Sequence, residues 1–144
     1  QQVSLVQNEN ELFSLVDSFG SKGFLLQKFV EASFGKDVRI NVVGDCAVCS
    51  MLRHSVNGDF RSNISNGGTA ERFEPNEETK KIAVAACRAL GLDFAGVDVL
   101  FGEGGRPLVC EVNSNPHFKS SLDCTGVDMS EIILRYIKEK VENQ

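Results

Sequence analysis

The spacing of hydrophobic residues along the chain switches between a helical period and strand alternation, which predicts a mixed α and β fold. Three segments are predicted as helices, and the first and the last repeat apolar residues every three to four positions after the N-cap candidates Asn8 and Asp128. These predicted helices begin after Asn8, Asn76 and Asp128. We expect the first two to end at Gly20 and Gly91, because glycine is common just past a helix end.

Alternating apolar runs predict the strands. One hairpin is expected from residues 37–43 and 46–54, around the turn at Gly44-Asp45, and another within 95–113. Two shorter strands and two polar loops complete the pattern: strands at 3–6 and 23–30, loops at 57–70 and 114–127. This order predicts an α+β fold, an antiparallel β-sheet with helices packed on one face.

Composition narrows the class of protein. The 144 residues are 42% hydrophobic, which fits a soluble globular protein with a single domain over residues 1–144. A formal net charge of −5 argues against a broad nucleic-acid-binding surface. No apolar run approaches the length of a membrane span, so we expect no membrane partner. Five cysteines, mostly in apolar strands or helices, favour reduced thiols and a cytoplasmic location.

The cysteines and histidines give no strong prediction of chemistry. Cys46 and Cys49 have C-x-x-C spacing, but residues three apart in a strand point to opposite faces. No second pair completes a zinc site, so we interpret both as structural. His54 and His117 lack a recognisable nucleophile partner and are interpreted as structural or solvent-facing.

The second hairpin carries an acidic pair. If residues 103–106 form its loop, Asp98 sits directly opposite Glu111, with Asn113 on the same face. Opposed like charges at ~5 Å repel by roughly 1–3 kcal/mol, and a hard cation between them reverses that sign. Two carboxylates and an amide oxygen suit Mg²⁺ shared with phosphates, whereas ordinary solvated acids are the alternative. The expected apolar face comprises Val97, Val99, Phe101, Leu108, Cys110 and Val112.

A polar stretch from Phe60 to Thr69 is the second candidate for chemistry. Arg61 offers a planar set of N–H donors suited to phosphate or carboxylate, and Ser62 and Asn63 add neutral donors. An ordinary solvated loop is the alternative interpretation. Lys28 and Arg53 lie on neighbouring expected strands and either face the same cleft or are surface charges. Arg39 alternates with Val38 and Ile40, so it points away from their apolar face and is available, with no role assigned.

Taken together, these stretches resemble the ATP-grasp ligases, specifically the RimK-type glutamate ligases. The matching segments, in chain order, are LQKFV at 26–30, GKDVR at 35–39, VVGD at 42–45, GDFRSN at 58–63, GGTA at 67–70, AGVD at 95–98 and EVNSNP at 111–116. They run from about residue 24 to the last helix. The resemblance implies that residues 1–144 are a C-terminal part of an ATP-grasp fold, inactive alone, whose N-terminal domain and lysine-bearing ATP subdomain are absent.

The resemblance also implies a role for each matching residue. Asp98, Glu111 and Asn113 correspond to the ligands of Mg²⁺ or Mn²⁺. Lys28 and Phe29 correspond to the segment beside adenine, and Asp37 to a nucleotide contact at the ribose. The contacts to nucleotide and acyl phosphate correspond to Arg61, Ser62 and Asn63, with Arg61 as the catalytic residue that neutralises charge.

The implied chemistry is ATP-dependent. The carboxylate of an amino acid such as glutamate attacks the γ-phosphate, and an amine or peptide acceptor then displaces phosphate to form an amide. A homo-oligomer is compatible with this. One alternative is another ATP-grasp ligase, similar to glutathione synthetase or to an amino-acid biosynthetic ligase. The others are a nucleotide- or metal-binding module without catalysis and a plain α+β interaction domain.

Overall fold

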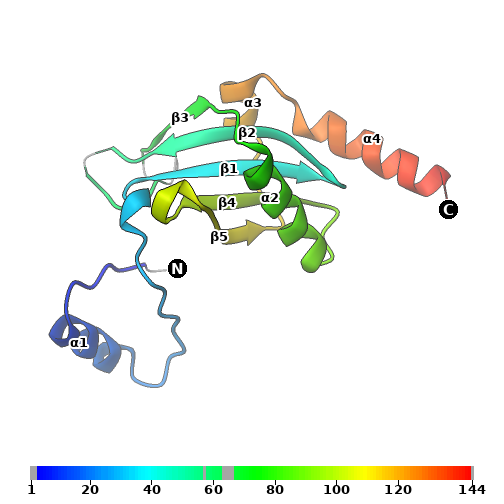
Figure 1. Cartoon of the computed structure of the whole chain (residues 1–144). Coiled ribbons are helices and arrows are strands. Elements are labelled where there is room, and N and C mark those ends of the chain that lie inside the picture. Colours follow the sequence, from blue (N-terminus) through cyan, green and yellow to red (C-terminus); the bar gives the residue numbers. More distant parts are fainter. Residues whose placement is uncertain (1–2, 57, 63–66, 144) are drawn as a thin grey trace.

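The computed structural model describes residues 3–56, 58–62 and 67–143. In these ranges the chain forms a five-stranded antiparallel sheet with the order β3-β2-β1-β4-β5 (Figure 1). Its strands are β1 (Lys36–Val43), β2 (Cys46–His54), β3 (Thr69–Arg72), β4 (Phe94–Phe101) and β5 (Pro107–Asn113). Both predicted hairpins, β1 with β2 and β4 with β5, are present. The α+β class is confirmed.

Four α-helices are present among the described residues: α1 (Glu9–Phe19), α2 (Glu77–Ala89), α3 (Lys119–Thr125) and α4 (Met129–Glu142). Three of them, α1, α2 and α4, begin where helices were predicted. The side chains of Asn8, Asn76 and Asp128 accept hydrogen bonds from backbone N–H groups of α1, α2 and α4 at 3.0, 2.9 and 2.9 Å. These bonds satisfy donors that the first turn of a helix leaves unpaired.

Some predicted loops and strands were wrong. Helix α3 lies inside the predicted loop at 114–127, and β3 begins within the last two residues of the predicted loop at 57–70. Residues 3–6 and 23–30, expected to be strands, are neither helix nor strand. Strand β3 is short and partly exposed, and it is paired through β2, so its register comes from tertiary contacts rather than from its own apolar pattern.

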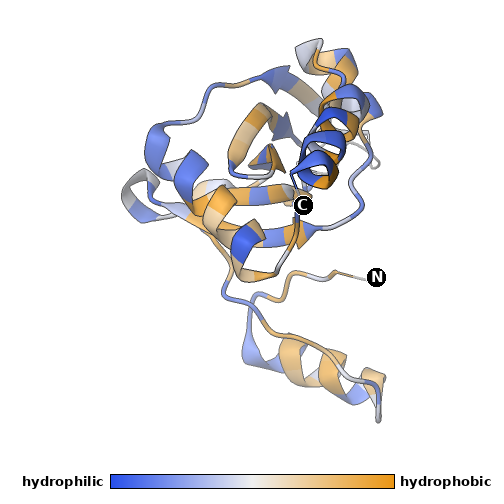
Figure 2. Cartoon of the chain, turned by 90° about the vertical axis from the view of Figure 1, so that its right-hand side faces the viewer, coloured by the Kyte–Doolittle hydropathy of each residue, from blue (hydrophilic) through white to orange (hydrophobic). Residues whose placement is uncertain are grey.

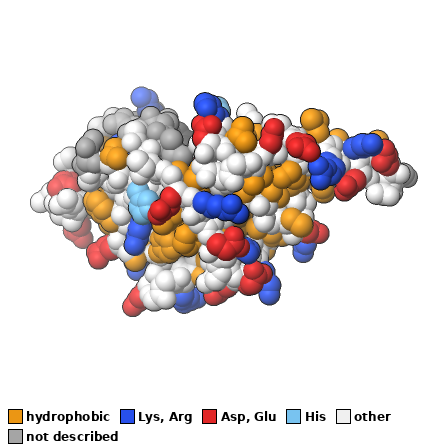
Figure 3. Space-filling view, turned by 90° about the horizontal axis from the view of Figure 1, so that it is seen from above, with side chains coloured by type: hydrophobic (Ala, Val, Ile, Leu, Met, Phe, Trp, Pro, Cys, Tyr) orange, Lys and Arg blue, Asp and Glu red, His pale blue; other side chains and the backbone are white. Residues whose placement is uncertain are grey.

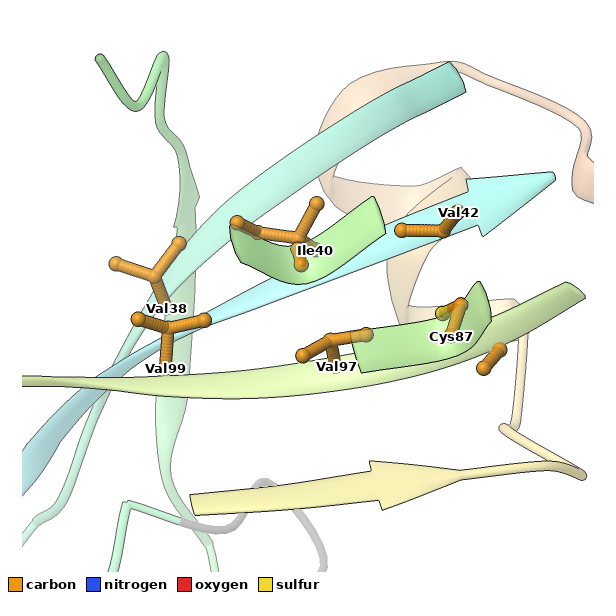
Figure 4. Close-up of a cluster of buried hydrophobic side chains, with 8 residues drawn as sticks. Val38, Ile40, Val42, Cys87, Val97 and Val99 are labelled. Atoms are coloured by element: carbon orange, nitrogen blue, oxygen red, sulfur yellow. The ribbon is translucent and has the colours of Figure 1, made fainter. Parts of the chain in front are cut away.

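Helix α2 covers one face of the sheet. Alternate residues of β1 and β4 point towards it and pack around Cys87 of α2 (Figure 4). The core residues labelled there are at most 2% exposed: Val38, Ile40, Val42, Cys87, Val97 and Val99. Strand alternation explains this core, since every second residue of β1 is apolar and faces the helix.

The opposite face of the sheet is covered at one end by α3 and the start of α4. Nδ2 of Asn41 donates to Oγ of Ser121 in α3 at 2.8 Å, and Val43 packs against Met129 and Ile133 of α4. The prediction that helices share one face therefore holds for α2 but not for α3 and the start of α4. The remainder of this second face is polar.

A β-bulge interrupts the β4–β5 ladder. Asp98 is paired with Glu111 and Val97 with Val112, but Val99 is paired with Val109, so Cys110 is the extra residue. The predicted apolar face is therefore correct for Val97, Val99, Phe101 and Val112, which lie in or against the core. It is wrong for Leu108 and Cys110, because the extra residue reverses the alternation of the part of β5 that precedes Glu111.

Two helices extend away from the sheet. Helix α1 is set apart from it and has no buried residue, although five of its eleven residues are apolar (Figures 1 and 2). The end of α4 projects on the other side, with charged side chains of both signs visible in Figure 3. Among the described residues, no helix combines the length and apolar character that crossing a membrane requires.

Candidate functional site

The polar face of the sheet gathers charged side chains from four strands. In β1, Asp37 and Arg39 alternate with the core residues and so point away from α2. The register pairs Asp37 with Arg53 of β2, and Arg39 with Asp98 of β4. Asp98 is paired in turn with Glu111 of β5, as the sequence predicted. Four neighbouring strands thus place cations beside carboxylates.

Two arginines hold the carboxylate of Asp98. Arg39 donates from Nε to Oδ1 and from Nη2 to Oδ2, the second bond at 2.8 Å. Arg53 adds a contact from Nη2 to the same Oδ2 at 2.9 Å. Asp98 is 5% exposed, so these charged contacts are made largely out of water. Charge-assisted bonds of this kind compensate for the desolvation of the carboxylate.

Arg53 is shared between two carboxylates. Besides its contact with Asp98, it donates from Nε to Oδ1 of Asp37 at 2.8 Å and from Nη2 to Oδ2. Arg53 and Asp37 are each 5% exposed. Burial opposes the charge of Arg53, but its hydrogen bond to Asp37 and the charge of Asp98 outweigh burial and raise its pKa. The guanidinium therefore stays charged and ties β1, β2 and β4 together.

Glu111 and Asn113 complete an oxygen-rich edge of this face. The carboxylate of Glu111 is exposed and forms no hydrogen bond or ion pair with any described residue. Among the described residues, Oδ1 of Asn113 accepts one hydrogen bond, a local one from the backbone N–H of Asn115 at 3.1 Å. Asn113 is paired with Gly96, two residues from Asp98, and therefore lies on the same face as Asp98 and Glu111.

This donor set fits a hard divalent cation. It supplies two carboxylates and an amide oxygen from adjacent strands, and oxygen ligands with open positions suit Mg²⁺ or Mn²⁺. Within the described ranges, no three His, Cys, Asp or Glu side chains converge as a metal site, so the set at this edge consists of two carboxylates and the amide of Asn113. A cation bound at Asp98 would lie next to Arg39 and Arg53, which contact the same carboxylate.

Arg61 lies at a separate cavity of about 590 Å³. The cavity is lined by Leu5, Gln7, Phe34, Ser55, Val56, Gly58, Asp59, Phe60, Arg61 and Gly68. Arg61 donates to Asp59 from Nε at 3.1 Å and from Nη2 at 2.8 Å. The hydrogen bonds from Arg61 lower the pKa of Asp59 to about 2. Arg61 has five N–H donors, so part of its donor capacity is left for an anion in the cavity.

The other predicted nucleotide contacts are only partly assembled. Phe29 reaches the same loop, since its ring centroid lies 6.3 Å from that of Phe60. Ser62 is buried, with 7% of its surface exposed. Lys28 is exposed, and Asn63 lies outside the described residues. Asp37 is buried on Arg53 rather than open to solvent.

Gly35 connects the Arg61 loop to the end of β2 through backbone hydrogen bonds. Its backbone N–H donates to the carbonyl of Phe60 at 3.0 Å, and its carbonyl accepts from the N–H of Ser55 at 2.7 Å. The end of β2, the Arg61 loop and the start of β1 therefore meet at one residue. Its φ of +62° is a conformation that favours glycine.

Sequence reasoning underestimated Arg39 and Arg53. The sequence leaves open whether Arg53 is a surface charge and assigns Arg39 no role, whereas the structure pairs both with carboxylates that the sequence had singled out. Strand alternation contained the signal, because Arg39 and Asp37 share a face and the hairpin places Arg53 opposite Asp37. The interpretation of the cysteines is consistent with the structure, in which all five are free.

Known proteins are similar to this chain in sequence and in fold. The RimK-like ATP-grasp domain family matches residues 1–137. A "Probable alpha-L-glutamate ligase 1" of Shewanella sp. (strain MR-4) is 40% identical over 141 residues, which cover 96% of this chain and 46% of that relative. The chain thus spans about half the length of this curated relative.

Solved structures of the ATP-grasp ligase PsnB have the same fold. A complex with a phosphomimetic variant of the minimal precursor, Mg and ADP gives a TM-score of 0.63 at 23% identity, over 80% of this chain and 34% of that one. A complex with precursor peptide PsnA2 and AMPPNP gives 0.59 at 25% identity, over 78% and 34%. On the match over residues 1–137, the chain belongs to the RimK-like ATP-grasp family.

Proposed function

We propose that this chain carries the metal- and phosphate-handling part of an ATP-dependent carboxylate–amine ligase. The observation that carries the proposal is the pairing of Asp98 with Glu111 on adjacent strands, with Asn113 on the same face. Opposed acids with an amide beside them are unfavourable in isolation and are well suited to a divalent cation. Membership of the family and the glutamate ligase name of the relative support this assignment.

The reaction proceeds in two transfers. A substrate carboxylate, with glutamate as the favoured donor, attacks the γ-phosphorus of ATP and ADP leaves. The amine of an acceptor or peptide then attacks the acyl carbon, phosphate leaves, and an amide forms with loss of one proton. The peptide and nucleotide complexes of PsnB support these substrate classes.

The residues divide the work by charge. Asp98, Glu111 and Asn113 would hold Mg²⁺ or Mn²⁺, which when bound supplies positive charge for the phosphate oxygens. Arg61, which lines the cavity, would neutralise charge on the transferred phosphoryl group. Ser62 and Asn63 would add neutral donors there. Lys28 and Phe29 would lie beside the base, and Asp37 near the ribose.

A substitution of Asp98 tests the metal site. We expect Asp98→Asn to abolish Mn²⁺ binding measured by electron paramagnetic resonance and to remove the stabilisation by Mg²⁺–ADP measured by thermal shift. The matched control is Asp45→Asn, because Asp45 is an exposed acid paired with Arg88 at 2.7 Å. Equal Mn²⁺ affinity in wild type and Asp98→Asn contradicts the assignment of Asp98 as a ligand.

The ion pairs of Asp98 favour one second candidate, a nucleotide-binding module without catalysis. In that case Asp98 serves only as the partner of Arg39 and Arg53. Such a module would bind ADP equally well with and without Mn²⁺. It would form no ADP from ATP when glutamate and an amine acceptor are added. Metal-dependent nucleotide binding rejects this candidate.

A further inference from the structure

Arg39 occupies the oxygens of Asp98 that a cation needs. An ionised carboxylate has about four lone-pair sites on its two oxygens. Arg39 uses one site on each oxygen, and Arg53 uses another on Oδ2. The remaining site is on Oδ1, so a divalent cation there shares that oxygen with Nε of Arg39, and the two positive charges repel at close range. The cation and an arginine compete for the same carboxylate.

The two arginines are not equally able to leave. Arg53 is anchored by Asp37 through Nε and Nη2, and this anchor does not involve Asp98. In the described part of the chain, Arg39 has hydrogen bonds to Asp98 alone, and its side chain is 11% exposed against 6% for Arg53. Losing Asp98 leaves Arg53 paired but leaves Arg39 without a partner. Asp37 holds Arg53 in place whether or not Asp98 is released, whereas in the described chain only Asp98 holds the more exposed Arg39, so Arg39 is the residue with the freedom to turn towards solvent when a cation takes its oxygens.

We propose that Arg39 is a positioning residue that holds Asp98 until a divalent cation replaces it, while Arg53 remains on Asp37. The proposal rests on the proposed function, because it takes Asp98 as a metal ligand. After the exchange, the guanidinium of Arg39 carries its charge beside the metal site and is available to an anionic group. Arg39 thus makes metal binding weaker than Asp98, Glu111 and Asn113 alone would allow.

If Arg39 competes with the cation, a neutral replacement should strengthen metal binding. If Arg39 only supports the structure, the same replacement should weaken it or leave it unchanged. We expect Arg39→Gln to bind Mn²⁺ about tenfold more tightly than wild type by electron paramagnetic resonance, because the competing charge is gone. Arg39→Lys keeps the charge without the paired geometry and should fall between them. The control is Arg135→Gln, an exposed arginine paired with Glu131 on α4, whose affinity should match wild type. Weaker or unchanged binding in Arg39→Gln overturns the proposal.

A second measurement uses the wild-type chain. Nitrogen-15 NMR follows the Nε–H protons of Arg39 and Arg53, assigned by comparison with Arg39→Lys. Titration with Mg²⁺ should speed solvent exchange of the Arg39 proton and leave the Arg53 proton protected. Equal protection of both protons at saturating Mg²⁺ overturns the proposal, and this result does not depend on the folding of Arg39→Gln.

The outcomes separate this proposal from the function on which it rests. If wild type binds Mn²⁺ and Asp98→Asn does not, the metal site stands, and the Arg39 variants then test the exchange alone. If Asp98→Asn binds Mn²⁺ as wild type does, the metal site itself is wrong and the exchange falls with it.

Discussion

The guanidinium of Arg39 lies over Gly96, so closely that a Cβ atom on Gly96 would be 2.9 Å from Nη1 and 3.1 Å from Cδ of Arg39. The same atom would lie 3.0 Å from Cβ of Pro116. The missing side chain at Gly96 therefore provides the room in which Arg39 reaches Asp98. Gly96 therefore affects the placement of Arg39 on the polar face although it has no polar side chain.

Substitution of Gly96 should disturb this arrangement. We expect Gly96→Ala to lower the free energy of unfolding by roughly 1–3 kcal/mol in urea denaturation, because the methyl group overpacks the face. Gly23→Ala is the control, since a Cβ there meets nothing within 4 Å; its change should stay within about 0.5 kcal/mol. Equal stability of the two variants would show that Arg39 adapts without cost.

Gly35 is expected to be the more sensitive glycine at the cavity. A Cβ there would lie 2.9 Å from the carbonyl oxygen of Asp59, and the φ of +62° already disfavours other residues. Gly91→Ala isolates the conformational part, because its φ is +66° and nothing lies within 4 Å. We expect Gly91→Ala to cost about 1–2 kcal/mol and Gly35→Ala roughly 1–3 kcal/mol more by urea denaturation. A difference near zero removes the steric argument.

The pair of Asp59 and Arg61 should be visible in a pH titration. The hydrogen bonds from Arg61 lower the pKa of Asp59 to about 2, so the folded chain holds this carboxylate ionised more firmly than the unfolded chain does. Its stabilising effect is therefore present above the ordinary pKa of Asp and is lost as the pH falls towards 2. Carbon-13 NMR of the Asp59 carboxyl should give a midpoint near pH 2, and Arg61→Gln should raise it towards the ordinary value. An unchanged midpoint in Arg61→Gln excludes Arg61 as the cause.

The core under α2 should dominate stability. Ile40 is fully buried at 0% exposure, so Ile40→Ala leaves a cavity and should cost about 2–5 kcal/mol by chemical denaturation. Leu134 on the projecting α4 is 67% exposed, and Leu134→Ala should change stability by no more than about 0.5 kcal/mol. A large loss for Leu134→Ala would indicate that this surface is covered in solution.

Local signals in the sequence predicted most of the secondary structure. The caps at Asn8, Asn76 and Asp128 and the turn at Gly44 act within a few residues, so the pattern alone located three helices and a hairpin. Helix α3 has no capping hydrogen bond at its start, and it is held by tertiary contacts such as that of Ser121 with Asn41. Contacts of this kind leave no periodic trace.

The candidate site divides in the same way. The predicted opposition of Asp98 and Glu111 is present, but not through the predicted loop of residues 103–106, because Phe101 is paired with Pro107 and the extra residue Cys110 then brings Glu111 opposite Asp98. The ion pairs of Arg39 and Arg53 depend on which strand neighbours β1, and β4 is far from it in the sequence. The ligand roles of Asp98, Glu111 and Asn113 stay a prediction.

The extra residue at Cys110 separates two requirements of β5. Between Pro107 and Val109 the strand follows one alternation, and from Glu111 onward it follows the other. Sequence changes before Cys110 can therefore tune how the strand fits against Val99 without rotating the acidic end. Removing Cys110 would force a single phase on the whole strand, so that Glu111 and the packing residues could no longer both be oriented as they are.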